Sequence, residues 1–342
     1  MSHGLITPQR LGLFLAAILL VVAALALGAA IGETSIDLDI VGKTVANRLW
    51  DAGWTLDPID EGIIWEYRLS RAVVAACCGV ALALSGVVLQ ALLRNTLADP
   101  YILGISAGAS TGAVTVAILG IGAGVLSLSF GAFVGALFAF GLITLLAFRA
   151  GGGAAATILA GVAGSQLFNA LTSLIVTKSG NAEQSRAIMI WLLGNLSGAR
   201  WDDVWLALPV AAFGLLVCLL HGRALDAFTF GAESAASLGI SVRRVQATLI
   251  GLAALMTSAM VSIVGCIGFV GLVIPHAARM LFGVRHGALL PASAVIGAVF
   301  MVAADVVSRV IVPGQVIPIG VITALVGAPA FAIILTQRRA AR

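Results

Sequence analysis

The sequence contains few charged residues. Of its 342 residues only 10% are charged, whereas 61% are apolar, and the mean hydropathy is +1.11. A soluble domain cannot bury that much apolar surface, so a lipid bilayer must cover it. The net charge of +4 comes from basic residues scattered at the ends of apolar runs. This pattern predicts orientation in a membrane rather than a nucleic-acid partner.

Residue patterns typical of catalysis or metal binding are also missing. There is no HExxH motif, no Ser/His/Asp set and no pair of carboxylates in an apolar run. The tripeptide Gly42-Lys43-Thr44 resembles the end of a phosphate-binding loop, but Asp37 stands where that loop needs its first glycine. We therefore expect no catalytic residue, no metal site and no cofactor bound by this chain. The four cysteines fall inside apolar runs without metal-ligand spacing: Cys77, Cys78, Cys218 and Cys266.

Ionisable residues are nearly absent from the middle of the apolar runs. Asp305 is the main exception, and Arg309 follows it one helical turn later, so we expect an ion pair at a helix end rather than a proton relay. The lack of a carboxylate or histidine near the bilayer midplane weakens coupling to protons. Sodium coupling through backbone carbonyls remains open. Otherwise the pathway is passive or is driven by a partner.

Ten apolar runs are long enough for transmembrane helices, each of which needs about 20 residues. They predict an all-α polytopic membrane protein with one transmembrane domain over residues 1–342. Basic residues in the inner loops place both termini in the cytoplasm. The runs are 11–31, 69–91, 101–119, 126–148, 154–177, 204–221, 245–264, 268–283, 289–308 and 316–336.

Two polar segments separate some of these runs. Residues 32–67 are rich in acidic residues and tryptophan and are predicted to form a periplasmic loop. Residues 222–244 are predicted to form a cytoplasmic loop, in which Gly231 precedes a short helix, AESAAS, that could transmit force from a bound protein. Glycines spaced four residues apart, as in Gly108 and Gly112 or Gly131 and Gly135, predict closely packed helices.

One apolar run carries a polar face. In residues 154–177, polar side chains recur at steps of three and four, which places them on one side of a helix. These side chains either line a water-filled pathway or form hydrogen bonds between helices. The pathway-lining candidates are Gln166, Asn169, Thr172 and Ser173.

Several blocks of sequence resemble the FecCD/BtuC-type permease family of bacterial ABC importers for iron chelates, haem and vitamin B12. The blocks are RNTLADPYILGISAGA, GAESAASLG, GFVGLVIPHAAR with ALLPASAVIGA, and PIGVITALVGAP, and the resemblance extends from about residue 68 to residue 330. It implies a type II importer permease in the bacterial inner membrane. The implied partners are a second permease subunit in a homodimer, two cytoplasmic ATPase subunits and a periplasmic substrate-binding protein. ATP and Mg would be used by the ATPase, so the chain itself would not be an enzyme.

The resemblance also implies roles for individual residues. The coupling to the ATPase would involve Gly231, Glu233, Ala236, Leu238 and Gly239. Docking of the binding protein would involve Arg68, Arg71 and Arg309, and the cytoplasmic gate would involve Asn95 and Leu97. The chain departs from the family pattern at Ser70 and Thr96, which replace the usual prolines and free a backbone N–H at each turn.

We expect a ferric siderophore as the substrate, with haem or cobalamin as alternatives. The polar face in residues 154–177 offers amides and hydroxyls but no Met, His or Tyr to grip haem iron. The competing hypothesis is an ion-coupled secondary carrier that works without an ATPase.

Overall fold

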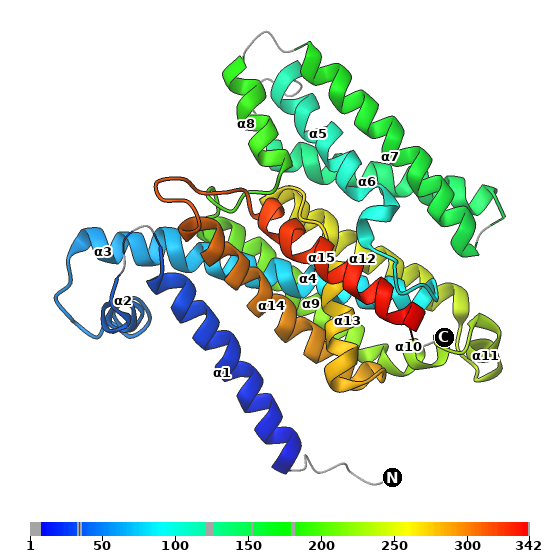
Figure 1. Cartoon of the computed structure of the whole chain (residues 1–342), viewed down its shortest axis with the longest axis horizontal. Helices are drawn as coiled ribbons and strands as arrows, with labels where there is room; N and C mark the ends of the chain where they lie inside the picture. The colour runs from blue at the N-terminus through cyan, green and yellow to red at the C-terminus, as the bar shows by residue number, and fades with distance from the viewer. Residues whose placement is uncertain are drawn as a thin grey trace.

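The chain folds into a helical bundle in which many of the helices run lengthwise between two ends of the molecule (Figure 1). This computed structural model describes residues 8–32, 34, 36–120, 126–151, 153–178 and 182–340. All the regular secondary structure within those ranges is helical. The prediction of an all-α fold is therefore confirmed.

All ten predicted apolar runs are helical. Three are short apolar helices: α5 (Ile105–Leu119), α13 (Val270–Phe282) and the Ile319–Ile333 part of α15 (Ile319–Ala340). Seven others in the described ranges are long and apolar enough to cross a membrane: α1 (Pro8–Ala30), the run Pro58–Leu92 that ends in α4 (Ser70–Leu92), α6 (Leu128–Arg149), α7 (Gly153–Thr177), α9 (Trp201–Leu220), α12 (Val242–Val264) and α14 (His286–Val310).

The short helices α5 and α13 each begin after an irregular stretch of backbone. At about 1.5 Å per residue, a helix of 13 or 15 residues is shorter than the roughly 30 Å hydrocarbon core of a bilayer. A 3₁₀ turn, Pro100–Leu103, precedes α5, and residues 265–269 precede α13. The backbone N–H of Ile267 donates to the hydroxyl of Tyr101 at 2.8 Å, so the two irregular stretches lie side by side. The side chain of Tyr101 therefore satisfies a polar backbone group of the stretch before α13 inside the protein.

Helix α4 forms the centre of the bundle and is buried along nearly its whole length. Two glycines allow its backbone to touch neighbouring helices. A Cβ atom on Gly79 would overlap the carbonyl of Gly297 in α14, and one on Gly86 would overlap the carbonyl of Gly271 in α13. These contacts fix the height and rotation of α4 against both helices.

The glycine faces predicted from four-residue spacing also pack as expected. Gly108 and Gly112 of α5 lie against Gly135 and Gly131 of α6, so close that a Cβ atom on either α5 glycine would overlap α6 backbone. The prediction of closely packed helices is confirmed.

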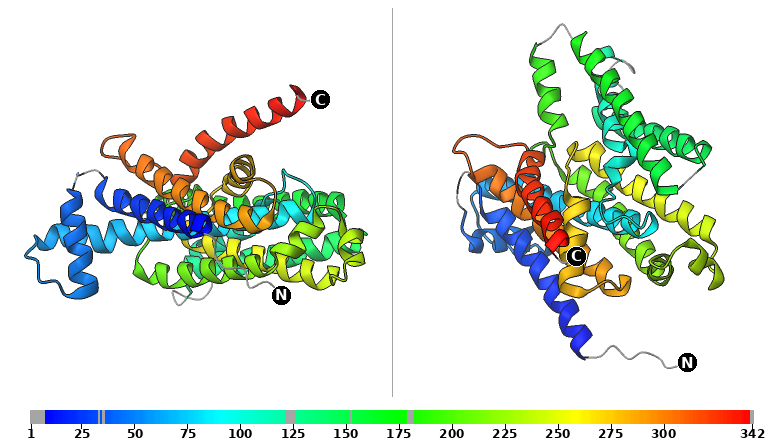
Figure 2. Two further views of the ribbon diagram at one scale, coloured as in Figure 1. Left: turned by 90° about the horizontal axis from the view of Figure 1, so that it is seen from below. Right: turned by 45° about the vertical axis from the view of Figure 1, so that its right-hand side comes forward.

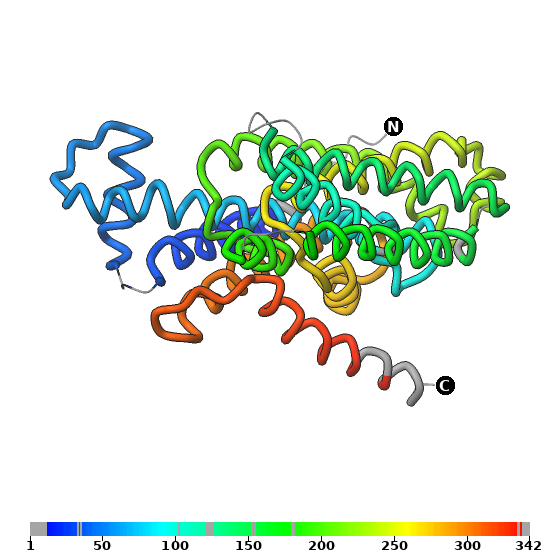
Figure 3. Tube along the Cα trace, turned by 90° about the horizontal axis from the view of Figure 1, so that it is seen from above, coloured from blue at the N-terminus to red at the C-terminus, as the bar shows by residue number. Residues whose placement is uncertain are grey.

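The two polar segments form short helices at opposite ends of the molecule (Figures 1 and 3). At one end lie α2 (Leu38–Trp50) and α3 (Pro58–Gly62), and α3 continues through a π-helical turn, Ile63–Leu69, into α4. The segment 32–67 is therefore largely helical rather than an extended loop. The side chain of Asn47 donates to the carbonyl of Trp54 and accepts from its backbone N–H, and these two hydrogen bonds close the turn between α2 and α3.

The opposite end carries α10 (Gly222–Phe228) and α11 (Ala232–Ser237). Helix α8 (Ala182–Leu192) connects α7 to α9 in the chain. Helix α15 leans away from the other helices (Figure 2) and exposes Leu325 and Val326. Which end faces the cytoplasm stays a prediction.

Candidate functional site

A buried cluster of charges lies at the end of the bundle near α2 and α3. Asp305 of α14 is fully buried, and its Oδ1 accepts a hydrogen bond from Nε of Arg71 in α4 at 2.6 Å. Nη2 of Arg309 lies 3.0 Å from Oδ2, as an ion pair without hydrogen-bond geometry. The predicted Asp305–Arg309 pair is therefore confirmed, and Arg71 is a second partner that comes from a different helix.

Arg309 and Arg68 donate hydrogen bonds to the carbonyl groups at the end of α1. The last carbonyl groups of a helix lack partners within the helix and carry partial negative charge. Arg309 donates to the carbonyls of Gly28 and Ile31, both at 2.8 Å. Arg68 donates to the carbonyls of Ala29 and Ala30, at 3.2 and 2.8 Å.

The three arginines predicted to dock the binding protein are buried and bonded within the subunit. Arg68, Arg71 and Arg309 are each only 6 to 7% exposed, and their donors bind groups of the same subunit. Each of these buried guanidinium groups has its partners within the subunit, as a buried charge requires. The two guanidinium groups of Arg71 and Arg309 share the one carboxylate of Asp305, so this pair retains an excess of positive charge. Docking through that charge stays a prediction.

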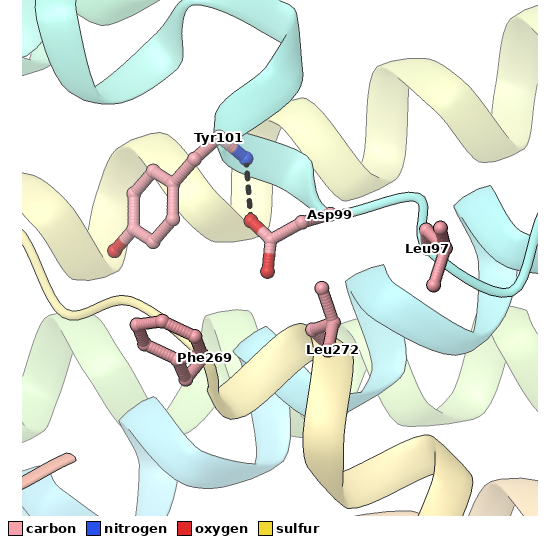
Figure 4. Close-up of a pocket in the computed structure, with 5 residues that line it drawn as sticks. All are labelled: Leu97, Asp99, Tyr101, Phe269 and Leu272. Carbon is pink, nitrogen blue, oxygen red and sulfur yellow. Dashed lines mark hydrogen bonds between the residues drawn. The ribbon is translucent and has the colours of Figure 1, made fainter. Parts of the chain in front are cut away.

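A hollow lies where the two irregular stretches meet (Figure 4). The Asp99 carboxylate accepts a hydrogen bond from the backbone N–H of Tyr101 at 2.8 Å through one oxygen, and the other oxygen points into the hollow. Phe269 adopts a left-handed backbone conformation, with φ of 69°, which is strained for a residue with a side chain. The side chains that line the hollow are Leu97, Asp99, Tyr101, Phe269 and Leu272.

Only Leu97 of these five residues was predicted as a site residue. Sequence reasoning gave the other four no role in a site, and the backbone strain at Phe269 leaves no signature in the sequence. The carboxylate of Asp99 lies 3.4 Å from where a Cβ atom on Gly271 would stand, so it is packed against α13. Across the described residues, no group of three or more His, Cys, Asp or Glu side chains could hold a metal ion.

The predicted gate residues belong to the turn between α4 and the 3₁₀ turn. Leu97 lines the hollow, whereas Asn95 shapes the turn, since its side-chain oxygen accepts from the backbone N–H of Leu97 at 3.0 Å. Gln90 binds this turn to α13 by donating to the carbonyls of Ala98 and Gly271 at 3.3 and 3.2 Å. A gate formed by Asn95 and Leu97 stays a prediction.

The polar face of α7 divides into two parts. Gln166, Asn169 and Ser173 are exposed on the subunit surface. Thr172 is buried, and its hydroxyl lies 2.9 Å from the hydroxyl of Thr111 in α5. Of the two roles left open for this polar face, Thr172 has the hydrogen bond between helices. Lining by the other three residues stays a prediction.

The coupling segment, residues 222–244, presents apolar side chains on a polar surface. Leu238 is 72% exposed and Phe230 is 77% exposed, on either side of α11. Ala235 is buried and anchors α11. Like Leu238, three further predicted coupling residues are exposed: Glu233, Ala236 and Gly239. Sequence reasoning missed Phe230, although an aromatic residue in a polar loop is a usable signal.

Glycine is required at both ends of α11. Gly231 has φ of 110° and Gly239 has φ of 80°, conformations that residues with a Cβ atom rarely adopt. A Cβ atom on Gly231 would stand 3.4 Å from Nη1 of Arg94, which precedes the gate turn. The coupling segment therefore reaches the end of α4.

Comparison with known proteins identifies relatives along nearly the whole chain. The model of the FecCD transport family matches residues 7–337. The "Cobalamin import system permease protein BtuC" of Halobacterium salinarum is 43% identical over 277 residues, which cover 81% of this chain and 74% of that protein. The "Probable siderophore transport system permease protein YfhA" of Bacillus subtilis is 36% identical and covers 95% and 94%. A solved structure, described as a candidate metal-chelate type ABC transporter in an inward-facing conformation, has a TM-score of 0.81 at 30% identity and covers 95% and 99%.

Replacing Asp305 tests whether its carboxylate holds the buried arginine cluster together. We expect Asp305→Ala to lower the free energy of unfolding by about 3–5 kcal/mol, because Arg71 and Arg309 would be left buried without a counter-charge. The measurement is thermal unfolding of the purified protein in detergent. Asp39→Ala is the control, since Asp39 forms an exposed pair with Lys43 and exposed pairs contribute roughly 0–1 kcal/mol. Equal melting temperatures for the two variants would contradict this role of Asp305.

Proposed function

Because this chain belongs to the FecCD transport family, it is a permease subunit of an ABC importer, and we propose that it carries a ferric siderophore across the inner membrane of a bacterium. The ATP would be hydrolysed by separate subunits that bind the coupling segment. The proposed assembly contains two copies of this chain, two ATPase subunits and a periplasmic binding protein. The family match over residues 7–337 is the observation that carries the proposal.

The shape of the coupling segment supports an ATPase partner. Helix α11 has only six residues, ends in glycines at both sides, and is flanked by the exposed side chains of Phe230 and Leu238. A short helix with apolar flanks fits a cleft on another protein better than it fits water. Closure of such a cleft on binding ATP would displace α11 and the helices attached to it.

Two exposed surfaces support a second permease subunit and a pathway beside it. Helix α15 exposes Leu325, Val326 and Ile333, as expected of a face that meets lipid or another subunit. Gln166, Asn169 and Ser173 form a polar row on α7. A polar row costs free energy against lipid, so water or a second subunit would have to cover it.

The arginine cluster supports docking of a binding protein by long-range attraction. The guanidinium groups of Arg71 and Arg309 share the single carboxylate of Asp305, which leaves an excess of positive charge, and Arg309 binds the carbonyls at the end of α1. An acidic surface on the binding protein would be drawn to this excess charge, which raises association rates more than it adds affinity.

The relatives support three candidate substrate classes. Two Bacillus subtilis proteins named for siderophore and Fe(3+)-citrate transport are 36% and 37% identical and cover 95% and 94% of this chain. The amides and hydroxyl on α7 suit the oxygen-rich surface of an iron chelate. Cobalamin is the second candidate, because the cobalamin permease of Halobacterium salinarum reaches 43% identity over 81% of the chain. Haem follows from a hemin permease of Yersinia pestis, at 34% identity.

Transport in liposomes tests the function and the substrate together. We expect the permease, reconstituted with the ATPase and binding protein encoded beside it, to accumulate a ferric siderophore only when ATP is hydrolysed. The assay compares a ferric hydroxamate, ferric citrate, haem and cobalamin, with a non-hydrolysable ATP analogue as the control. Accumulation of cobalamin alone would favour the second candidate. Uptake by the permease without an ATPase would overturn the importer and favour a secondary carrier.

A charge on the coupling segment should release the ATPase. We expect Leu238→Asp to reduce copurification of the ATPase subunit about tenfold or more, because a carboxylate would enter an apolar cleft. Leu38→Asp, which changes a leucine that is 55% exposed in α2 at the opposite end, is the matched control and should retain the ATPase. Equal copurification and equal transport by both variants would refute the assigned role of Leu238.

Reducing the charge of the arginine cluster should slow docking. We expect Arg68→Gln to lower the association rate of the binding protein several-fold and to weaken its dependence on salt, because the long-range attraction falls. Surface plasmon resonance at several salt concentrations measures both effects. Arg149→Gln, at the other end of the molecule, is the control. An unchanged rate in Arg68→Gln, with normal folding, would remove the docking role from the cluster.

A further inference from the structure

The coupling segment is joined to α14 by one pair of side chains. Asp226 of α10 accepts two hydrogen bonds through the same oxygen, from the backbone N–H of His286 at 2.9 Å and from Nδ1 of its ring at 2.7 Å. An ionised carboxylate can only accept, so Nδ1 carries the proton in this contact. His286 is buried, and it is the first residue of α14.

This contact is a cap supplied from a distant part of the chain. The first backbone N–H groups of a helix have no partner within it and usually bind a side chain just before the helix. At α14 the preceding residue, Arg285, provides no such bond. Asp226, 60 residues earlier, takes its place, and its negative charge suits the positive end of the helix dipole. The inner end of α14 is therefore attached to α10.

Helices α10 and α11 move together because little separates them. The backbone N–H of Gly231 donates to the carbonyl of Phe228 at 3.0 Å, and that of Ala235 donates to Gly231, also at 3.0 Å. Leu225 and Phe228 of α10 are fully or almost fully buried, as is Ala235 of α11. A displacement of α11 would therefore displace α10 and the carboxylate of Asp226.

Helix α14 connects this contact to the arginine cluster. Its 25 residues span roughly 37 Å at 1.5 Å per residue, from His286 near the coupling segment to Asp305 and beyond. The side of α14 that touches α4 is fixed at Gly297 by backbone contact with Gly79. Packed cores and interfaces transmit displacements between discrete arrangements rather than absorbing them.

We propose that the Asp226–His286 contact is the joint through which movement of the coupling segment reaches α14 and, at the far end of that helix, the cluster around Asp305. Asp226 and His286 are thus positioning residues for transport. Through this joint, the state of the ATPase would change the affinity for the binding protein. Docking of the binding protein would in turn affect the ATPase, since coupling between sites is reciprocal. This inference rests on the proposed function.

The test measures how strongly the binding protein stimulates ATP hydrolysis by the reconstituted complex. We expect the Asp226→Ala variant to retain the ATPase subunit. Its stimulation by the binding protein should fall at least about fivefold, which is the lower end of the coupling usually found between two sites. Asp226→Asn should keep most of the stimulation, because an amide oxygen can still accept both hydrogen bonds. Asp202→Ala, which removes a carboxylate in the first turn of α9, is the matched control and should respond as wild type.

The outcomes separate this inference from the proposed function. Wild-type protein that binds no ATPase would contradict the importer itself. Normal stimulation in Asp226→Ala, with the ATPase bound, would overturn the joint alone. If Asp226→Ala does not fold, His286→Ala carries the test, since it removes the ring bond and keeps the backbone bond, and unchanged stimulation there would overturn the joint equally. When Asp226→Ala and His286→Ala are combined, the loss of stimulation should be no larger than in Asp226→Ala alone, because both changes act on one contact.

Discussion

The buried carboxylate of Asp305 is the interaction on which the end of the structure near α2 and α3 depends. It binds Arg71 of α4 and Arg309 of α14, and Arg309 with Arg68 binds the last carbonyls of α1. Charged groups removed from water are costly unless each has a partner. The three helices must therefore stay at one height relative to each other, since sliding any of them by a turn would leave a charge or a helix end without a partner.

Backbone contacts between glycines align α4 with its neighbouring helices further along the bundle, toward the end that carries α10 and α11. Gly79 against Gly297 and Gly86 against Gly271 leave no room for a side chain, so α4 serves as the reference for α14 and α13. The break before α13 then lies beside the break before α5, where Ile267 donates to Tyr101. The hollow that includes Leu97 and Asp99 exists because two broken helices meet there, and irregular backbone at this position needs protein or water around it.

The same rigidity gives an ATP-driven permease its means of transmission. In the proposed assembly the ATPase is a separate subunit, so the permease would receive work as displacement, and α11 is a small element with exposed apolar flanks. A joint between α10 and α14 would carry the displacement into the bundle, because α14 packs on α4 without side chains that could absorb it. The charge cluster at one end of the molecule and the coupling segment at the other would then belong to one mechanical path.

The sequence by itself determined the features that depend on neighbouring residues in the chain. Hydropathy located all ten apolar helices, four-residue spacing identified the glycine faces of α5 and α6, and one-turn spacing paired Asp305 with Arg309. Only the tertiary structure decided which distant groups meet. Arg71 reaches Asp305 across 234 positions, Thr172 binds Thr111 of another helix, and Asp226 caps a helix 60 residues later. These pairings depend on how far each helix is rotated and how deep it lies, and both are set by packing between helices, which periodicity along one helix does not encode.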